Sequence, residues 1–328
     1  MRDRATAARG WGRRIVNAAG IIVVITVLAT VGSAVWVESS LRRVDVLSNY
    51  EGRPTAGVGT NWLLVGSDSR EDLTPEQQAA LATGGDVGSG RTDTILIVHI
   101  PGLLSSEPTT MVSIPRDSYV DIPGHGMDKI NAASAIGGPS LLAQTIEQDT
   151  GLRLDHYAEI GFAGFGDVVD ALGGVRLCPV DPINDPLAGI DLPAGCQTLN
   201  GPNALGYVRT RATPRADLDR MIHQREFMSA LLHRAGNPWV WLNPWRWYSV
   251  PHAALSALTV DSGAHVWSLA ALGWGLHGST QTLTVPIGEF TVNEVGDVVV
   301  WDSNSAGALF DALRTDSAIP QEVLDGQP

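Results

Sequence analysis

Short apolar runs recur along the chain and predict buried β-strands. They lie at Trp62–Val65, Thr94–Ile100, Thr110–Ile114, Tyr157–Ile160, Gln281–Val285 and Val298–Trp301. Between many of them, apolar residues recur three or four positions apart, which is the period of a helix with one buried face. These patterns cover Pro139–Thr150, Phe162–Leu172, Ala216–Ala235, His265–Gly275 and Ser305–Arg314, with Gly151, Gly173 and Gly236 as expected helix ends. Alternating strands and helices predict an α/β fold whose central sheet is covered on both faces.

The longest apolar run, Ile15–Val37, carries no charged residue and follows five arginines. At about 1.5 Å per helical residue, it is long enough to cross the ~30 Å hydrocarbon core of a bilayer. Positively charged flanks stay in the cytoplasm, so the rest of the chain is expected on the far side of the membrane. A cleaved signal peptide is the alternative, because Gly32, Ser33 and Ala34 fit a processing site.

No low-complexity linker divides the rest of the chain, which favours one large domain. We expect a cytoplasmic basic tail at residues 1–14, a transmembrane helix at 15–37, a stalk at 38–58, an extracytoplasmic domain at 59–316 and a C-terminal tail at 317–328. The protein is therefore expected to be a single-pass protein of the cell membrane.

The acidic composition and the two cysteines fit an exported domain. A formal net charge of −13 argues against nucleic acid as a partner. Cys178 and Cys196 flank a segment rich in proline and glycine, and in an oxidising compartment we expect them to pair. Such a disulfide would stabilise the fold by roughly 3 kcal/mol. Two unrelated buried thiols are the alternative.

Charged motifs stand next to three predicted strands. GSDSR at Gly66–Arg70 follows one strand, RTDT at Arg91–Thr94 opens the next, and SIPRD at Ser113–Asp117 ends a third. In open α/β sheets, sites lie just beyond the carboxyl ends of strands. Each motif by itself is equally compatible with a structural ion pair.

A fourth cluster combines an arginine pair with a polar helix stripe. Arg209 and Arg211 are two residues apart, which predicts one face of an extended segment. Asp217, Arg220 and Gln224 then follow on one stripe of the predicted helix, and a solvated polar face is the plainer interpretation of that stripe. The concentration of arginines favours a binding site.

Arginines gathered near carboxylates suit a substrate with more than one phosphate, because a guanidinium grips phosphate oxygens in pairs. One or two carboxylates among them suit Mg²⁺, which binds carboxylates together with substrate phosphates. The chemistry indicated is phosphoryl transfer. No GxSxG, HExxH or Walker A motif is present.

In their order along the chain, these motifs resemble the LytR-CpsA-Psr (LCP) family, actinobacterial type. The motifs are Gly66–Arg70, Arg91–Thr94, Ser113–Asp117, Lys129–Asn131, Val169–Val175, Leu199–Gly201, Tyr207–Arg211 and Arg220 with Gln224. The resemblance implies a mixed β-sheet between helical layers and an extracytoplasmic phosphotransferase. Such enzymes move a glycopolymer from a polyprenyl-pyrophosphate carrier onto peptidoglycan and form a phosphodiester. In actinobacteria the polymer is often arabinogalactan.

The resemblance also implies roles for single residues. Asp68 and Asp93 would hold Mg²⁺, and the catalytic set would be Asp68, Asp93, Arg116 and Arg211. The pyrophosphate would be bound by Arg70, Arg91, Arg116, Arg209, Arg211, Arg220 and Gln224. A tunnel for the lipid would be lined by the apolar faces of Pro139–Thr150 and Phe162–Leu172. Two features depart from the family pattern: His223 replaces the usual arginine, and Glu71–Gly90 is an unusually long insertion.

Two other functions stay open on the sequence. A polyprenyl-pyrophosphate pyrophosphatase would use water in place of the sugar hydroxyl, and a non-catalytic envelope protein would bind or regulate without transfer. The residues do not name the glycopolymer or the acceptor hydroxyl.

The stretch from Trp239 to Tyr248 is rich in aromatic residues. We expect these residues to pack in the core rather than to contact a membrane.

Overall fold

The structure is a computed structural model that describes residues 17, 20, 21, 24, 27, 28, 30–67, 92–210, 212 and 217–327. For residues 92, 93, 162, 163, 217–221 and 232 it describes the backbone alone. The chain divides into two compact units, Met1–Leu41 and Arg42–Pro328. All the described strands belong to the second unit.

The first unit is helical wherever it is described, and residues 30–40 form an unbroken helix. Apolar side chains along this unit are exposed, including Leu28, Val31 and Val35. No helix made of described residues alone has the length and apolar content needed to cross a membrane. Much of the expected span at 15–37 lies outside the described residues, so the span stays a prediction.

The second unit is built on a seven-stranded sheet with the order β1-β12-β7-β2-β3-β4-β13. The strands are β1 (Arg42–Val44), β12 (Leu258–Asp261), β7 (His156–Gly161), β2 (Thr60–Ser67), β3 (Thr92–Ile100), β4 (Thr109–Ile114) and β13 (Thr280–Thr284). The pairs β1–β12, β7–β2 and β4–β13 are parallel, and the other neighbours are antiparallel. The mixed sheet predicted by the resemblance is confirmed.

Apolar side chains explain the central strands. Leu63 of β2, Ile97 of β3 and Val112 of β4 are fully buried, as expected for strands covered on both faces. The predicted run Val298–Trp301 also forms a strand, but it lies outside the main sheet. There β15 (Gly296–Trp301) pairs with β14 (Ile287–Asn293), and β5 (Tyr119–Ile122) pairs with β6 (Gly126–Lys129) in a second hairpin.

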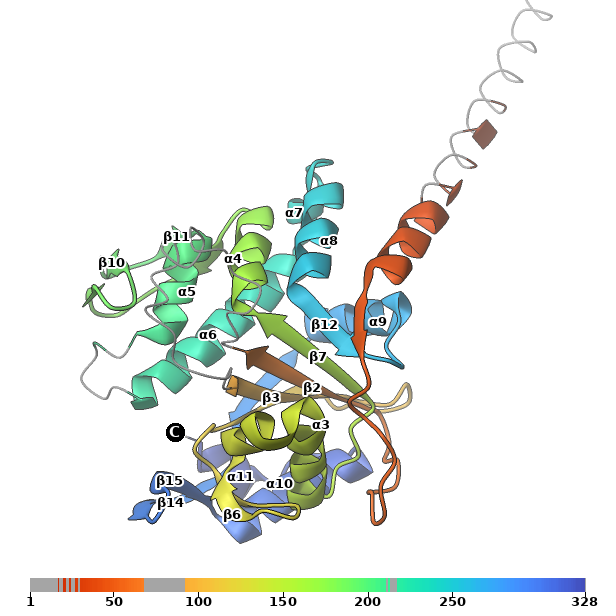
Figure 1. Cartoon of the computed structure of the whole chain (residues 1–328). Helices are drawn as coiled ribbons and strands as arrows, with labels where there is room; N and C mark the ends of the chain where they lie inside the picture. Colours follow the sequence, from red (N-terminus) through yellow and green to blue (C-terminus); the bar gives the residue numbers. More distant parts are fainter. Residues whose placement is uncertain are drawn as a thin grey trace, which may run out of the picture. The chain divides into compact units, whose positions relative to one another are not determined.

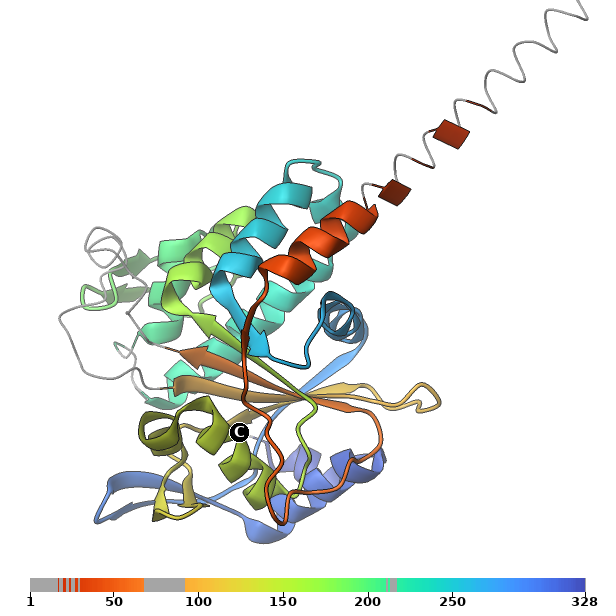
Figure 2. The same cartoon turned by 45° about the vertical axis from the view of Figure 1, so that its right-hand side comes forward.

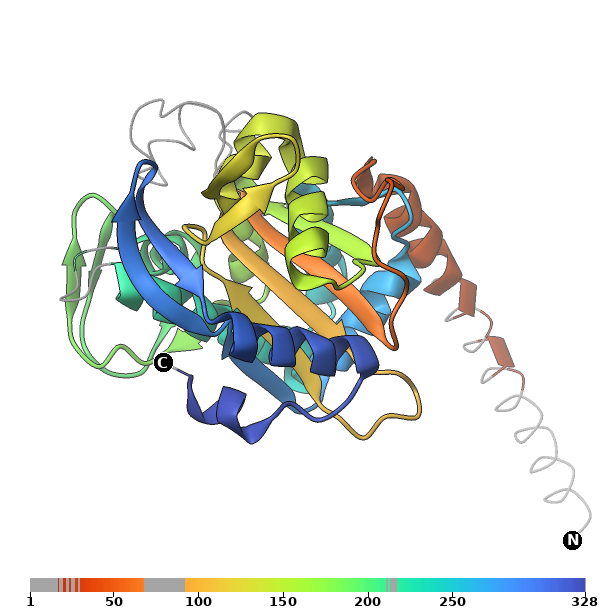
Figure 3. The same ribbon diagram turned by 90° about the horizontal axis from the view of Figure 1, so that it is seen from below.

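Three helices cover one face of the sheet: α3 (Ile130–Thr150), α10 (Ser303–Thr315) and α11 (Gln321–Asp325) (Figures 1 and 3). Their buried side chains join those of the strands in one apolar cluster, called the α3 core here. Its members from the helices include Leu142, Ile146, Leu309 and Val323. This face thus carries a continuous apolar packing layer.

Helix α3 begins nine residues earlier than the predicted start at Pro139. The helix is interrupted at Gly137 and Gly138, where Gly138 has φ +69°, so Pro139 opens the second segment rather than the whole helix. Proline fits a first helical turn because its missing N–H needs no partner there. The expected end at Gly151 is confirmed, with φ +67° and its N–H donating to Glu147 O.

A buried ion pair supports the α3 core. Glu147 of α3 has a side chain only 2% exposed, and it accepts bonds from Nε and Nη2 of Arg53 at 3.0 and 2.9 Å. It also accepts the N–H of Leu154. The carboxylate is therefore fully engaged, which a buried charge requires.

The opposite face carries α4 (Phe162–Ala171), α5 (Gly201–Arg209), α6 (Asp217–Gly236) and α8 (Arg246–Ala257) (Figures 1 and 2). Helices α7 (Pro238–Trp241) and α9 (Val266–His277) complete this side. Two small ladders pair β8 (Val175–Leu177) with β11 (Gln197–Leu199) and β9 (Ile183–Asp185) with β10 (Ile190–Leu192). Buried residues of these helices and ladders form a second apolar cluster, called the α6 core here. It includes Val169, Tyr207 and Phe227.

The positions of α3 and α4 overturn one expectation. Leu142 and Ile146 of α3 belong to the α3 core, whereas Val169 of α4 belongs to the α6 core. The two helices lie on opposite faces of the sheet (Figure 1), so their apolar faces do not line one tunnel. Helices cover both faces, as predicted.

Candidate functional site

The strand register brings the ends of several motif-bearing strands to one edge of the sheet. Ser67, at the end of β2, lies opposite Thr92 at the start of β3 and opposite Gly161 at the end of β7. Ile114, at the end of β4, pairs with Ile95 near the start of β3. The motifs that follow or open these strands are therefore anchored at the same edge.

The structure describes the predicted site residues unequally. Arg116, Arg209 and Gln224 are described with their side chains, and Asp93 and Arg220 through their backbone, in β3 and α6. Asp68, Arg70, Arg91 and Arg211 lie outside the described residues, as does the insertion Glu71–Gly90. The backbone of Asp93 falls at an irregularity of the β2–β3 register, next to the Ser67–Thr92 pair.

Arg116 lies in the turn after β4, within a small cluster of charges. Its Nε donates to Asp117 Oδ2 at 3.3 Å, and Lys129 Nζ lies 3.2 Å from Asp117 Oδ1. The turn is fixed because Arg116 O accepts the N–H of Asn131 and Ser118 O accepts that of Ile130. Two cations thus share one carboxylate, so this cluster of three charges is net positive.

The segment around Arg209 is helical, so its predicted extended conformation is wrong. Helix α5 runs through Arg209, because Asn200 caps its start by accepting the N–H of Asn203 and Pro202 stands in its first turn. Only at Thr210 does the backbone become extended. The alternation of Arg209 and Arg211 that suggested a strand is instead the end of a helix and the segment after it.

Gln224 connects α6 to this helix end. Its Nε2 donates to Val208 O at 3.4 Å, next to Arg209. Arg220 stands one turn earlier on α6, so the two residues share a side of the helix. Figures 1 and 2 show β2 directed toward the side of the unit that carries α5 and α6. The three predicted pyrophosphate ligands Arg209, Arg220 and Gln224 therefore belong to two helices joined at this point.

Sequence reasoning missed the anchor of this helix end. Thr210 is fully buried, and its Oγ1 donates to Asp185 Oδ2 at 2.8 Å. The other oxygen of Asp185 accepts the N–H groups of Leu187 and Ala188. Asp185 thus holds both its own loop and the residue between Arg209 and Arg211. No spacing pattern connects residues 25 positions apart.

Tyr207 and His223 add a second contact between α5 and α6. The two rings lie 4.3 Å apart between centroids, and Tyr207 Oη donates to Glu226 Oε2 at 2.9 Å. Burial raises the pKa of the Tyr207 phenol, and the charge of Glu226 raises it further, so the phenol stays protonated and keeps donating. The ring of His223 therefore packs against Tyr207 of α5.

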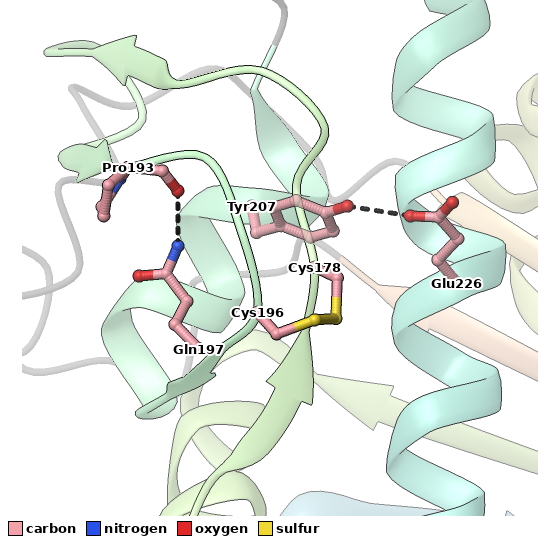
Figure 4. The surroundings of a disulfide bond; sticks show 6 residues. All are labelled: Cys178, Pro193, Cys196, Gln197, Tyr207 and Glu226. Atoms are coloured by element: carbon pink, nitrogen blue, oxygen red, sulfur yellow. Dashed lines mark hydrogen bonds between the residues drawn. A yellow bond between two sulfur atoms is a disulfide. The ribbon is translucent and has the colours of Figure 1, made fainter.

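The predicted disulfide is present between Cys178 and Cys196 (Figure 4). It lies at the end of the β8–β11 ladder, because Cys178 follows β8 and Cys196 precedes β11. Gly195 N–H donates to Pro179 O beside it. Gln197 Nε2 donates to Pro193 O at 2.7 Å across the same turn (Figure 4). The bond thus closes the base of the loop that carries Asp185.

Within the part of the chain that the structure describes, no three His, Cys, Asp or Glu side chains gather as a metal site would require. The predicted ligands Asp68 and Asp93 are not among those side chains. The described residues do provide Arg116 and Lys129 together beside Asp117, and Arg209 at the end of α5. Cationic side chains of this kind suit an anion with several oxygens.

Comparison with known proteins identifies the relatives of this chain. The LytR_cpsA_psr family model matches residues 37–314. The probable cell wall biosynthesis protein LcpB of Corynebacterium glutamicum is 53% identical over 296 residues, which are 90% of this chain and 70% of LcpB.

Solved structures share the fold. A LytR-Csp2A-Psr enzyme from Actinomyces oris matches with a TM-score of 0.65 at 23% identity, over 84% of this chain and 96% of that one. TagT bound to LI-WTA matches with a TM-score of 0.58, also at 23% identity, over 83% and 94%. The family model covers most of the chain, and it agrees with the motif order and the mixed sheet. The chain therefore belongs to the LytR_cpsA_psr family.

Proposed function

We propose that this protein acts in cell wall biosynthesis as a Mg²⁺-dependent phosphotransferase. It moves a glycopolymer from a polyprenyl-pyrophosphate carrier onto a hydroxyl of peptidoglycan. Arabinogalactan is the candidate polymer. The family membership and the similarity to LcpB support the cell wall role. The phosphoryl chemistry rests on the arginines and carboxylates of the ordered motifs.

One observation carries the proposal: the β2–β3–β4 register anchors three charged motifs at a single sheet edge. Arg116 and Lys129 stand there in a fixed turn. Asp68 follows Ser67 directly in sequence, and Asp93 follows Thr92, the residue paired with Ser67. A pyrophosphate needs such a mixture, since its charge must be neutralised while a nucleophile approaches.

The donor set fits Mg²⁺. Asp68 and Asp93 would hold the ion, because one or two carboxylates with substrate phosphate oxygens are its usual ligands. When bound, the ion supplies charge neutralisation at the phosphates. It needs no cysteine or histidine ligand, in keeping with the chemistry of the motifs.

The reaction balances as a simple exchange at phosphorus. The hydroxyl oxygen of peptidoglycan bonds to the phosphorus that carries the sugar, and the bond from that phosphorus to the bridging oxygen breaks. Polyprenyl phosphate leaves with the bridging oxygen, and a carboxylate at the edge accepts the hydroxyl proton. Arg116, Arg209 and Arg220 bind and orient the phosphate oxygens.

We place the catalytic unit outside the cytoplasm, held by a helix at residues 15–37. The arginines before that segment and the exposed apolar side chains Leu28, Val31 and Val35 support this placement. A retained helix keeps the site near the bilayer that holds its lipid carrier, which raises their effective concentration.

Transfer assays on Asp68→Ala and Arg211→Ala test the proposal. With a defined lipid-linked oligosaccharide and peptidoglycan, each change should abolish the covalent adduct seen by mass spectrometry, while circular dichroism stays unchanged. A chelator should have the same effect on the wild type. Arg314→Ala is the matched control, because Arg314 is half exposed and pairs with Asp311 on α10. Full activity in both site variants would refute the assignment.

The same assay separates the alternatives. A pyrophosphatase uses water to split the lipid-linked substrate into polyprenyl phosphate and the glycan phosphate, and it forms no adduct when peptidoglycan is added. A non-catalytic envelope protein binds the substrate and releases nothing, with or without a chelator.

A further inference from the structure

An exposed aromatic surface lies where α7 turns into α8. Its members are Trp239, Leu242, Trp245, Trp247 and Tyr248, each 66–83% exposed, and the group is called the aromatic tip here. The expectation that these residues pack in the core is therefore wrong. Trp241 is only half-buried, and Val240 is the buried member of the stretch.

Hydrogen bonds hold the aromatic tip in place. Asn237 and Asn243 each accept the N–H two residues on, which starts the turn before each proline-led segment. The indole of Trp241 donates to Ala235 O at 2.8 Å, and that of Trp247 donates to Trp241 O at 2.6 Å. These hydrogen bonds fix the backbone that carries the exposed rings.

The stretch of sequence that contains the aromatic tip has no acidic residue. From Phe227 to Val260 there is no Asp or Glu, although the chain holds 35 of them. The β14–β15 hairpin is the contrast, since it carries Glu289, Glu294 and Asp297. Figures 1 and 2 show α7 and α8 at one end of the unit and β14 and β15 at the other. The stretch that forms the aromatic tip therefore carries no carboxylate of its own, whereas α4, which packs against α8, carries the exposed Asp167 and Asp170.

Two guanidinium groups converge below the aromatic tip, over Gly173. A Cβ at Gly173 would collide with Nη2 of Arg246 and come within 3.4 Å of Nη2 of Arg234. Arg234 Nε donates to Leu172 O and Arg246 Nη1 to Val240 O, so backbone carbonyls aim both groups. Neither arginine forms an ion pair among the described residues. Such a pair suits a phosphate.

We propose that the aromatic tip inserts into the headgroup region of a lipid bilayer, where Arg234 and Arg246 bind a lipid phosphate. Tryptophan and tyrosine favour that region because their rings are apolar and carry a polar group. The stretch from Phe227 to Val260 has no carboxylate and so adds no repulsion from anionic lipids. The residues of this contact differ from those of the predicted span at 15–37 and from the predicted pyrophosphate ligands.

Probes at single sites test the contact on the full chain. Trp245→Cys and Val292→Cys are each labelled with an environment-sensitive fluorophore; both positions are exposed, and the native cysteines are paired. The protein is placed in vesicles of phosphatidylcholine and phosphatidylglycerol that contain a nitroxide-labelled lipid. The probe at 245 should be quenched about threefold more than the probe at 292, which lies on the acidic hairpin.

The arginine pair is tested in the same vesicles. Arg234→Gln with Arg246→Gln should lower the quenching at 245 about twofold, whereas Arg314→Gln leaves it unchanged. Equal quenching at 245 and 292 would overturn the bilayer contact. So would a probe at 245 that is already shielded without lipid, because another protein or a second copy would then cover the tip. Equal quenching at 245 in the wild type and in the double arginine variant would refute the assignment of a lipid phosphate to Arg234 and Arg246. No glycan substrate is present, so these results are independent of transfer.

Discussion

The two faces of the sheet are built differently. The α3 core is a continuous apolar layer supported by a buried ion pair, Arg53–Glu147. The α6 core is smaller and is connected through polar contacts, among them Thr210–Asp185 and Tyr207–Glu226. The first face therefore secures the sheet, whereas the second positions the arginine-bearing helix end. Changes on the two faces should separate stability from activity.

The largest expected effect comes from breaking the ion pair of the α3 core. Arg53→Met leaves Glu147 buried without its guanidinium, which should cost about 3–5 kcal/mol of unfolding free energy. Urea denaturation measures the loss. Transfer by the fraction that remains folded should stay close to wild type. Activity that falls further than the folded fraction would show that this face also shapes the site.

The pH dependence of the unfolding free energy gives a second test of the α3 face. Burial, with the charge of Asp121 as a smaller cause, raises the pKa of the Asp149 carboxyl from 3.8 to about 7. Between those values the folded state keeps a proton that the unfolded state has lost. Stability from this group is therefore highest below about pH 4 and falls as pH rises to about 7.

Asp149→Asn should remove that fall. Its Oδ2 is buried without a hydrogen-bond partner among the described residues, so the neutral amide loses no bond there. Denaturation midpoints at acidic and neutral pH measure the effect, with the exposed Asp311→Asn as control. A variant that keeps the wild-type slope between pH 4 and 7 contradicts this assignment.

The smallest effect on stability is expected for a change in the α6 face, at Thr210. The same change should reduce activity strongly. Thr210→Val removes the bonds to Asp185 Oδ2 and from Ala212 N, at a cost of about 1.5–3 kcal/mol because Asp185 is charged and buried. Because Arg209 and Arg211 flank Thr210, transfer should fall about tenfold as the arginines lose their positions. Thr210→Ser retains the hydroxyl and should restore activity. Loss of kcat without rescue by serine would point to another cause.

The apolar pattern predicted the central strands and most helices. Buried strands are continuous apolar runs, and helices with one buried face have apolar residues three or four positions apart, so both leave a local pattern. It did not reveal β1 and β12 at the sheet edge. Those strands are three and four residues long, and β1 contains Arg42 and Arg43. Their strand conformation comes from pairing with each other and with β7, which no local pattern encodes.

The candidate site was predictable where a motif adjoins a strand end and less so elsewhere. Arg116 lies at the expected edge because Ile114 ends β4. The alternation at Arg209 and Arg211 suggested a strand, but the cap at Asn200 and the proline after it start a helix. Asp185 was out of reach for another reason. Its role depends on a tertiary contact with Thr210 across 25 residues.

The edge strand β1 also has a mechanical meaning. Any tension on the chain before Arg42 enters the second unit through β1, whose three residues pair with Thr259, Val260 and Asp261 of β12. The eight residues of β2, deeper in the sheet, are paired on both sides. Under load the short strand should detach first, leaving the register that aligns the motif-bearing edge intact. If the proposed helix at residues 15–37 anchors the chain, the residues released from β1 would lengthen the connection between that anchor and the site.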